Sequence, residues 1–420
     1  MIRPRLTPLA AIVLFAFAIR LVWIAWADFQ PTLSDDAGRY DFLGRSLAEG
    51  GGYVNPNGAT TMFWPPGYPF ILTAVYKLWP ERAFGDHEVT AALVLNAALG
   101  AATVALVYAI GRRAFDERAA LLGAGITALF PSLIFLSGVT LTETAFTFCA
   151  LLGVWLLVET EARRDLRLLV LAGAIIGFAA LVRGQAALLP LVAAPFWLAA
   201  TRDLRATAVR VAITGAMVAL ALLPWTIRNY IESDALVPVA SNAGVDLYIG
   251  HSDGADGRGR KVDDFVFRYP ELPPAEAEAR ISREGFREGL EYAAKHPLRE
   301  VELSARKLFW LFYTDREALR WTEAHGERPF LSAPARDALN VLSDVYYYAV
   351  LALAVIGAAR WASWRRPERL LLLSLAAYWT LVHIAFFADP RFHAPLLPLA
   401  ALFAAAGIQA ARNRFASPTM

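Results

Sequence analysis

The feature that most constrains this chain is a series of ten mostly apolar stretches. Each is close to the length of about 20 residues that a helix needs to cross a hydrocarbon core about 30 Å thick. They lie near residues 7–27, 89–110, 119–137, 141–158, 167–182, 185–200, 206–225, 340–359, 368–387 and 394–411. Only 19% of the 420 residues are charged, against about 25% in soluble proteins. The sequence therefore predicts an all-α polytopic membrane protein with a bundle of about ten transmembrane helices.

The arginines give this bundle an orientation. When the chain alternates between the two sides of a membrane, one side collects Arg3, Arg5, Arg112, Arg113, Arg163, Arg164, Arg167, Arg202, Arg205, Arg365, Arg366, Arg412 and Arg414. Such cations favour the cytoplasmic side, so we expect both termini in the cytoplasm. The first apolar stretch has no cleavage-site pattern, and we interpret it as a retained helix and not as a signal peptide. The sequence thus predicts a multi-pass protein of the plasma (inner) membrane.

This orientation places two segments outside the cytoplasm, residues 28–88 and 227–339. The longer one is rich in charge, since 36 of the 78 charged residues lie in the 110 residues that begin at Arg228. We expect it to be a small, mainly helical outer segment. It divides the chain into an N-terminal transmembrane part at 1–226 and C-terminal transmembrane helices at 340–420.

Two shorter helices are predicted in the first outer segment. In residues 35–49, side chains such as Tyr40 and Leu43 recur at helical spacing, and Gly50 follows as a stop. Residues 64–80 are apolar but too short to span, and counting them as a span would put every later arginine on the wrong side. We interpret both segments as helices at the membrane interface, where aromatic residues are favoured.

Composition and missing motifs exclude several classes of protein. A net charge of +2 argues against nucleic acid as a partner. The single cysteine, Cys149, excludes a disulfide framework and zinc-finger spacing. The chain has no Gly-x-x-x-x-Gly-Lys phosphate loop, no His-Glu-x-x-His and no Asp-x-Asp pair. The sequence therefore names no cofactor: a divalent metal is compatible with it, but no ligand spacing supports one.

Ionisable residues at the outer membrane surface are the first functional candidates, because such positions are costly for charge. Asp35 and Asp36 follow the first span. Asp35 suits the N-cap of a helix and a pair with Arg39 four residues on. Asp36 shares a helix face with Tyr40, which makes it the stronger functional candidate.

Thr140 and Glu143 lie at the outer end of the fourth predicted span. Their spacing fits a capping box, in which the threonine caps the helix and the glutamate reaches back to it. A capping carboxylate can still face a site, so Glu143 is a candidate in both interpretations.

Three arginines break the rule that cations favour the cytoplasm. Arg183, Arg228 and Arg391 are expected at the outer surface, where each is either a paired structural cation or part of an anion site. Because arginine binds phosphate bidentately, three at one depth indicate an anionic headgroup. His393 is the histidine that lies near this set.

The same residues carry a resemblance to a known family. The motifs are Asp36-Ala-x-x-Tyr40, Trp64-Pro-Pro-Gly-Tyr68-Pro69, Leu141-Thr-Glu-Thr144, Leu223-Pro-Trp-Thr-Ile-Arg-Asn-Tyr230, Asn242-x-Gly-x-x-Leu-Tyr-Ile-Gly250 and Asp389-Pro-Arg-Phe-x-x-Pro395. In this order, over nearly the whole chain, they resemble the GT-C class of polytopic glycosyltransferases, of the protein O-mannosyltransferase and lipid A aminoarabinose transferase type. The resemblance implies a GT-C-like helical bundle.

The resemblance also implies a reaction. In this family the first-loop aspartate is the usual catalytic base and corresponds to Asp36, with Asp35 beside it, and the acidic residue of the second outer loop corresponds to Glu143. The donor would be a polyprenyl-phosphate sugar, and the acceptor a hydroxyl of a lipid, glycan or protein. Because this donor already carries its leaving group, the site needs a base for the hydroxyl and cations for the departing phosphate. Single displacement would invert the anomeric carbon. The expected substrate-binding set is Arg183, Arg228, Arg391, His393, Tyr40, Tyr68 and Asn242.

Other interpretations stay open at this point. Aminoarabinose-type members often carry a basic residue before Pro-Pro, where this chain has Trp64, so the same donor contact is not implied. A flippase, a transporter or a non-catalytic lipid-glycan binding protein would also need outer arginines. A polymerase or ligase that acts on lipid-diphosphate oligosaccharides is a third, enzymatic alternative. Against a transporter, the mid-span residues are mostly apolar, whereas transporters place polar groups near the midplane.

Overall fold

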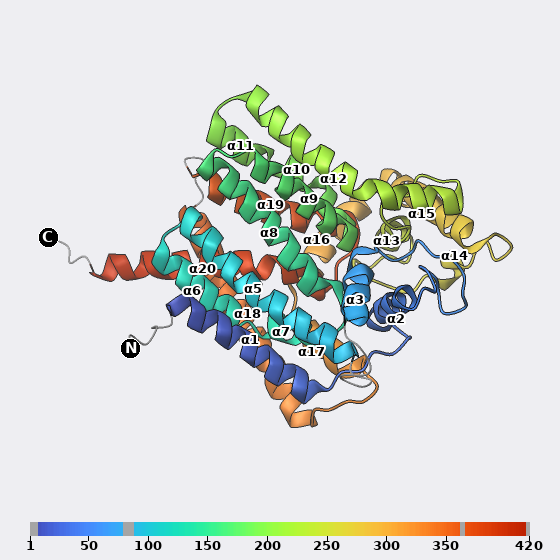
Figure 1. Ribbon diagram of the computed structural model, residues 1–420, viewed down its shortest axis with the longest axis horizontal. Helices are drawn as coiled ribbons and strands as arrows, with labels where there is room; N and C mark the ends of the chain where they lie inside the picture. Colours follow the sequence, from blue (N-terminus) through green and yellow to red (C-terminus); the bar gives the residue numbers. More distant parts are fainter. Residues whose placement is uncertain (1–6, 79–87, 362–365, 417–420) are drawn as a thin grey trace.

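Helices make up nearly all the regular structure of the described residues, 7–78, 88–361 and 366–416, in this computed structural model (Figure 1). The α-helices are α1 (Pro8–Ala27), α2 (Asp36–Ala48), α3 (Gly67–Leu78), α5 (Glu88–Ala114), α6 (Glu117–Ala128), α7 (Pro131–Phe135), α8 (Thr142–Arg163), α9 (Arg167–Val182), α10 (Leu189–Val192), α11 (Ala194–Thr201), α12 (Leu204–Ser233), α13 (Asn242–Gly250), α14 (Asp263–Val266), α15 (Pro274–Lys295), α16 (Pro297–Phe312), α17 (Glu317–Ala324), α18 (Ala333–Trp361), α19 (Pro367–Ala385) and α20 (Leu397–Ala416). Three 3-10 helices are η1 (Leu136–Gly138), η2 (Gly184–Leu188) and η3 (Pro390–Leu396).

Eight helical stretches of the described residues are long and apolar enough to cross a membrane. They are α1, α5, α8, the run Gly184–Thr201, α12, α18, α19 and the run Pro390–Gln409. A ninth is formed if α6 and the segment from α7 to η1, bent by 60° at their junction, count as one span. The predicted all-α polytopic bundle is confirmed, and eight or nine of its ten expected spans meet this length among the described residues. The difference is α9, whose 16 residues extend only about 24 Å at about 1.5 Å per residue.

The centre of the bundle is formed by α5, α8 and α9. Helix α8 packs against both α5 and α9, α9 packs against α12, and α1 covers α5, while α20 packs against α6 and α18. Small residues allow the closest contacts: a Cβ added to Gly173 of α9 would lie 2.9 Å from the Thr214 carbonyl oxygen of α12. Such small-residue interfaces let membrane helices gain van der Waals contact where lipid provides no hydrophobic driving force.

The two predicted outer segments meet at one end of the molecule. Figure 1 shows α2, α3 and α13 to α15 gathered there, opposite the end where α1 begins and α20 ends; we call this the α2 end. Thr61 of the first segment donates a hydrogen bond to Glu278 of the second at 2.7 Å, and Ser241 N–H donates to the Met62 carbonyl at 2.8 Å. The expected boundary at residue 226 falls within α12, which continues to the α2 end.

Both short helices predicted in the first outer segment are present as α2 and α3. Asp41 and Arg45 of α2 form an ion pair at 2.9 Å, and Tyr76 of α3 donates to Asp41 at 2.5 Å. The two helices therefore pack against each other as a hairpin, and the Asp41 carboxylate of α2 connects them. Trp79 and Pro80 of the predicted second helix, and the cations Arg3, Arg5 and Arg365, lie outside the described residues, as do the side chains of Arg412 and Arg414.

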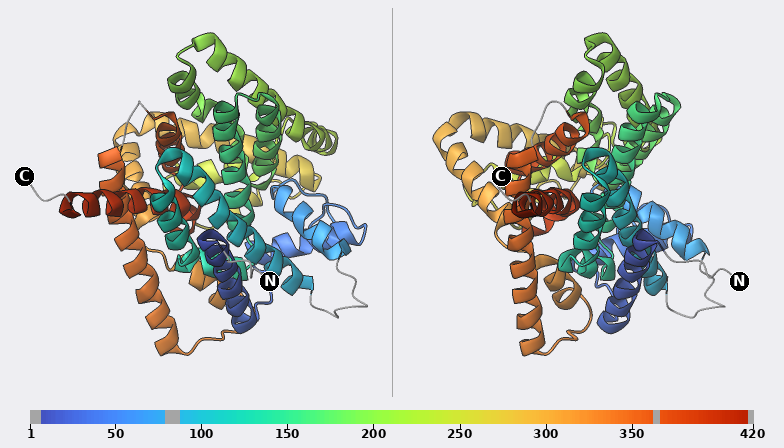
Figure 2. Two further views of the ribbon diagram at one scale, coloured as in Figure 1. Left: turned by 60° about the vertical axis from the view of Figure 1, so that its left-hand side comes forward. Right: turned by 90° about the vertical axis from the view of Figure 1, so that its left-hand side faces the viewer.

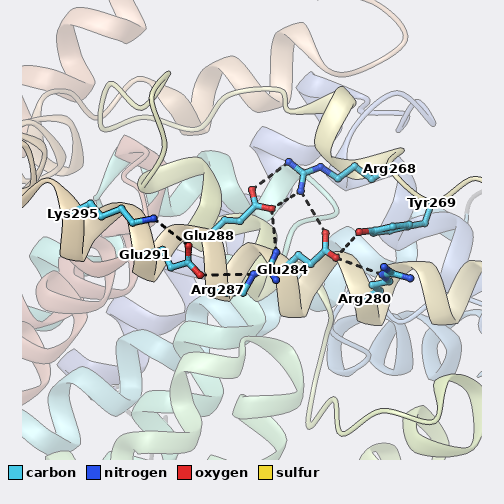
Figure 3. A network of polar contacts seen from close by, with 8 residues as sticks. All are labelled: Arg268, Tyr269, Arg280, Glu284, Arg287, Glu288, Glu291 and Lys295. Atoms are coloured by element: carbon cyan, nitrogen blue, oxygen red, sulfur yellow. Dashed lines mark hydrogen bonds and ion pairs between the residues drawn. The ribbon is translucent and has the colours of Figure 1, made fainter.

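The exposed face of α15 is a network of charges (Figure 3). Arg268 pairs with Glu288 at 2.5 Å, and Lys295 pairs with Glu291 at 3.4 Å. Each exposed pair contributes only about 0–1 kcal/mol. Such a face is stable in water and not in lipid, so α15 turns this side to solvent.

Candidate functional site

Four charged side chains from distant parts of the sequence meet at the α2 end. Arg391 Nη2 lies 3.1 Å from Asp36 Oδ2, and Arg391 Nε lies 3.2 Å from Glu143 Oε1. Arg183 Nη1 lies 3.3 Å from the same Glu143 oxygen. Two guanidinium groups and two carboxylates therefore form one neutral group, which we call the Asp36 cluster.

The start of α2 sets the position of Asp36. Asp35 is the N-cap, and its Oδ1 accepts hydrogen bonds from the backbone N–H groups of Ala37 at 3.0 Å and Gly38 at 3.4 Å. Gly38 packs so closely on the preceding loop that an added Cβ would lie 1.8 Å from the Thr32 oxygen. Asp36 is therefore the first residue of the helix, where the helix dipole stabilises a carboxylate.

Asp35 has different partners from Asp36, because adjacent residues on a helix do not face the same way. Asp35 Oδ2 lies 3.0 Å from His325 Nδ1, so its partner is His325 and not the expected Arg39. The His325 ring stacks on Trp321 with 4.0 Å between centroids. Trp321 in turn lies 4.3 Å from the guanidinium carbon of Arg391. His325, Trp321 and Arg391 thus pack in a row, with Asp35 in contact with His325 at one end and Asp36 in contact with Arg391 at the other.

Glu143 is the most deeply buried member of the cluster, with 1% of its side chain exposed. It lies in the first turn of α8, but the expected capping box is not formed. The N-cap residue Leu141 makes no side-chain hydrogen bond, and Thr140 instead donates to the Ala37 carbonyl at 3.0 Å. That bond fastens the start of α8 to α2. Because a buried carboxylate is costly without a partner, Glu143 depends on both arginines.

Asp36 is the accessible member of the cluster. Its side chain is 33% exposed, against 10% for Arg391 and 11% for Arg183. Arg391 also packs against the Phe392 ring at 5.4 Å, in addition to Trp321. The arginines are therefore held in place, while the Asp36 carboxylate can be reached by another molecule.

Two tyrosines from the predicted binding set line one side of the cluster. The Tyr40 ring lies 5.7 Å from the Tyr68 ring and 5.5 Å from the Trp64 ring. Burial raises the pKa of Tyr40, and the charge of Asp36 raises it further, so this phenol stays protonated. The Tyr68 hydroxyl accepts a hydrogen bond from Asn96 at 3.1 Å. This side of the cluster is thus an aromatic wall with neutral hydroxyl groups.

Asp246 faces the same cluster, although the sequence analysis did not single it out. Its Oδ2 accepts a hydrogen bond from Asn242 Nδ2 at 3.2 Å, which places the predicted residue Asn242 here too. Burial and the charge of Asp36 raise the pKa of Asp246 to about 7, while the charge of Arg183 lowers it. The signal that could have found Asp246 is its spacing of four residues from Asn242 within one motif.

Arg228 lies apart from the cluster. It donates hydrogen bonds to the backbone carbonyls of Thr61 at 2.8 Å and Tyr53 at 3.3 Å. It therefore ties the end of α12 to the first outer loop. The expected convergence of three arginines is corrected to two, because backbone acceptors already hold the third guanidinium group.

His393 is also outside the cluster. Its Nδ1 lies 2.8 Å from the Leu311 carbonyl oxygen, and its Nε2 lies 2.9 Å from Asp315 Oδ1. Both ring nitrogens are thus engaged by buried partners. The histidine supports η3, the short helix that carries Arg391.

The cluster does not have the donor set of a divalent-cation site. Within the part of the chain that the structure describes, no three His, Cys, Asp or Glu side chains are grouped to hold a metal. Asp36 and Glu143 are joined through Arg391, so a guanidinium group lies where a bridging cation would bind. The one cysteine, Cys149, is buried.

Part of the chain matches a family of known description. Residues 64–227 match the family model for dolichyl-phosphate-mannose-protein mannosyltransferase. This stretch carries Glu143 and Arg183. Among curated protein sequences, none matches the chain.

Solved structures share the fold over almost the whole chain. The Archaeoglobus fulgidus oligosaccharyltransferase in complex with zinc and sulfate aligns with a TM-score of 0.59 and 16% identity, over 97% of this chain and 49% of that chain. The Archaeoglobus fulgidus oligosaccharyltransferase AglB in complex with an inhibitory peptide and a dolichol-phosphate gives 0.58 and 14%, over 98% and 52%. ArnT from Cupriavidus metallidurans bound to undecaprenyl phosphate gives 0.48 and 15%, over 97% and 79%. This protein thus has a GT-C-like polytopic fold, and it spans about half the length of the archaeal chains it matches.

Proposed function

We propose that this protein is a glycosyltransferase that moves a sugar from a polyprenyl-phosphate donor to an acceptor hydroxyl at the extracytoplasmic face of the plasma (inner) membrane. The observation that carries the proposal is the Asp36 cluster, in which an accessible carboxylate lies 3.1 Å from one of two largely buried arginines. A carboxylate can accept a proton and arginines can hold a phosphate. The match of residues 64–227 to a mannosyltransferase family and the GT-C-like fold support the same class of reaction.

In this proposal Asp36 is the general base. It takes the proton of the acceptor hydroxyl while the hydroxyl oxygen attacks the anomeric carbon of the donor. The bond between that carbon and the phosphate oxygen breaks, and the polyprenyl phosphate leaves with the bonding electrons. Attack from the face opposite the phosphate inverts the configuration, and the proton stays on Asp36 until water takes it.

Arg391 and Arg183 hold the phosphate in this reaction. Arg391 contacts the Asp36 carboxylate. Proton transfer to Asp36 neutralises this carboxylate at the moment when the departing phosphate gains negative charge. The arginine can then interact more strongly with the leaving group, which stabilises the transition state where charge develops. Glu143 keeps both guanidinium groups in place. The AglB structure in complex with a dolichol-phosphate supports a lipid phosphate as the donor carrier.

Other members of the predicted set take supporting roles. Tyr40 and Asn242 would contact the sugar, since they lie beside the cluster and offer neutral hydrogen-bonding groups, and the fully buried Tyr68 packs behind Tyr40. His393 positions Arg391 through η3, and Arg228 fastens the first outer loop to α12.

Turnover by purified protein tests the proposal. The protein in nanodiscs is incubated with a panel of polyprenyl-phosphate sugars, and release of polyprenyl phosphate is measured, including slow hydrolysis by water. We expect Asp36→Asn to lose at least about 10²-fold, the low end for general-base catalysis, with donor binding retained. Asp35→Asn should be milder, because asparagine also caps a helix.

The matched control is Asp234→Asn, an exposed aspartate at the end of α12 in a left-handed conformation that asparagine tolerates. It should keep full activity. Equal turnover by wild type and Asp36→Asn would remove the proposed base. If no donor turns over but the protein moves the intact lipid-linked sugar across a liposome membrane, the flippase interpretation replaces this one.

A further inference from the structure

A cavity with both polar and apolar walls lies next to the Asp36 cluster, along α17. Its volume is about 860 Å³, within the range of about 300–1,000 Å³ of pockets that bind small molecules. Its walls are one face of α17, one face of α18 and the turn that follows α16. We call it the α17–α18 groove.

Helix α18 supplies a polar stripe although it is long and apolar enough to span the membrane. Arg336, Asn340, Asp344 and Tyr348 recur at every fourth residue, and all four line the groove. Leu342, which points to the other side, is 52% exposed. Figure 2 shows α18 (orange) at the edge of the bundle, where lipid can reach it. Polar residues in a spanning helix are costly unless they face a partner or a cavity, and the residues of this stripe line the groove, where Arg336 and Asp344 also form ion pairs.

The charges of the groove are balanced. Three arginines and three carboxylates cancel, so the groove has no net charge to attract an anion. The arginine side chains are still 42–58% exposed, and each guanidinium group has five N–H donors. The pairs are Arg316 with Asp344 at 2.5 Å, Arg320 with Glu317 at 3.2 Å, and Arg336 with Glu323.

Glu317 connects this groove to the Asp36 cluster. It lines the groove, and its pKa is raised by burial and by Asp389 and lowered by Arg320 and Arg391. Trp321, one turn further along α17, packs on Arg391 at 4.3 Å. At the start of α17, the groove therefore approaches the cluster through Glu317, which lines the groove and feels the charge of Arg391.

We propose that the α17–α18 groove binds the acceptor, and that the acceptor is a glycolipid: a membrane lipid with an uncharged headgroup rich in hydroxyls. The proposal rests on the proposed function, which requires an acceptor hydroxyl near Asp36. Hydroxyls both donate and accept hydrogen bonds, so they suit a groove of alternating guanidinium and carboxylate groups. Tyr313 and Tyr348, 48% and 46% exposed, offer ring faces at the mouth. The lipid tail lies along the exposed apolar side of α18.

Photo-crosslinking tests this without any donor or turnover. Benzoylphenylalanine replaces Tyr348 in the groove or, as a control, Val355, which is 62% exposed on the same helix and is not part of the groove. Each protein is placed in phosphatidylcholine nanodiscs that contain a small fraction of monoglucosyl diacylglycerol. We expect the glucosyl lipid to be several-fold enriched among the lipids captured at Tyr348, relative to Val355.

Asn340→Leu provides a second measurement, because leucine favours a helix but offers no hydrogen bond. It should lower the enrichment at Tyr348 towards the value at Val355, whereas Val341→Leu, on the exposed side of α18, should not. Equal lipid composition at Tyr348 and Val355 overturns the proposal. Preferred capture of phosphatidylglycerol, in nanodiscs that contain both lipids, also overturns it, since it would assign the groove to an anion.

A hydroxyl-bearing peptide that displaces the glucosyl lipid from Tyr348 would assign the groove to a protein acceptor, and so would equally overturn the proposal. Asp36→Asn should leave the enrichment unchanged. Enrichment without sugar transfer from any donor would therefore defeat the proposed function and leave the groove as a glycolipid site. Sugar transfer without enrichment of the glucosyl lipid at Tyr348 would support the proposed function and overturn the glycolipid site.

Discussion

At the scale of the residue, the Asp36 cluster depends on one arginine that touches two carboxylates of different exposure. Glu143, 1% exposed, is a fixed counter-charge, whereas Asp36, 33% exposed, can exchange its contact with Arg391 for a substrate. Arg183 shares the buried carboxylate, so in the proposed mechanism a cation stays on Glu143 when Arg391 turns to the phosphate. The sequence analysis expected Arg183, Arg228 and Arg391 to converge, and the structure brings Arg183 and Arg391 together and leaves Arg228 on backbone carbonyls.

Arg391→Lys should weaken donor binding. Lysine keeps the charge but loses the planar fork that contacts two groups at once, and losing one hydrogen bond to a charged group costs about 1.5–3 kcal/mol, or roughly 10- to 150-fold in affinity. The measurement is binding of a polyprenyl-phosphate sugar to folded, monodisperse protein. Arg228→Lys is the matched control and should leave donor affinity within a few-fold of wild type, because that side chain binds backbone carbonyls. A loss confined to Arg228→Lys would return the phosphate site to α12.

Asp246 should make stability depend on pH. Its pKa is raised to about 7 in the folded protein, against about 3.9 in an unfolded chain. The folded state therefore binds more protons between these values, so the free energy of unfolding falls as pH rises from about 4 to about 7 and then levels off. Asp246→Asn cannot titrate, and its unfolding temperature should fall less than that of wild type between about pH 5 and pH 8. Parallel curves for the two proteins would contradict the assignment.

At the scale of the element, α13 is held at the site by a close crossing with α15. A Cβ added to Gly244 would lie 1.8 Å from the Ser282 carbonyl oxygen, and one added to Gly285 would lie 2.2 Å from the Gly244 oxygen. Only glycine permits this approach of two backbones. The crossing therefore decides how far α13 reaches towards the Asp36 cluster.

Gly244→Ala should destabilise the protein by about 1–3 kcal/mol, the usual cost of overpacking. It should also lower turnover, because α13 carries Asn242 and Asp246. Gly215→Ala on α12 is the matched control: no atom lies within 4 Å of its added Cβ, and alanine in a helix is favoured over glycine by about 0.5–1 kcal/mol. Thermal unfolding and turnover of both variants check the prediction. Equal behaviour of the two alanines would show that the crossing has room to relax.

At the scale of the whole molecule, the first outer segment contacts the ends of three helices of the bundle, α8, α9 and α12. Thr140 at the start of α8 binds Ala37, Gly67 at the start of α3 packs on Val182 at the end of α9, and Arg228 near the end of α12 binds Thr61. The second outer segment then binds the first through Glu278. These contacts require the two segments to share one side of the membrane.

Cysteine labelling checks this topology. Cysteines placed at the exposed positions Asn57 and Gly254 should react with a membrane-impermeant maleimide in intact cells. A cysteine at Arg164 should react only after the membrane is opened, since the arginine distribution puts it in the cytoplasm. The native Cys149 is buried and should contribute little signal. Labelling of Asn57 and Gly254 from opposite sides would separate the two segments and remove the proposed site.

The amino-acid sequence alone determined the features that depend on neighbours a few residues apart. Apolar stretches predicted the spanning helices, because burying about 20 apolar residues in lipid needs no tertiary partner. The pattern of residues 35–49 predicted α2 with Asp35 as its N-cap, which the structure confirms. One prediction from short-range spacing was wrong: Thr140 and Glu143 have the spacing of a capping box, but Thr140 donates to the Ala37 carbonyl instead. A side chain with capping chemistry takes whichever acceptor the packing brings nearest.

Only the tertiary structure decided which charges meet. Asp36 and Arg391 are 355 positions apart in the sequence, and His325 rather than the nearby Arg39 binds Asp35. The inclusion of Arg183 and Asp246, the exclusion of Arg228 and the α17–α18 groove all follow from how helix ends are placed against one another. Hydropathy and caps place a residue along its own helix, but the partners of a buried charge are set by the packing of other helices, because a charge in a low-dielectric site is stable only beside its counter-charge.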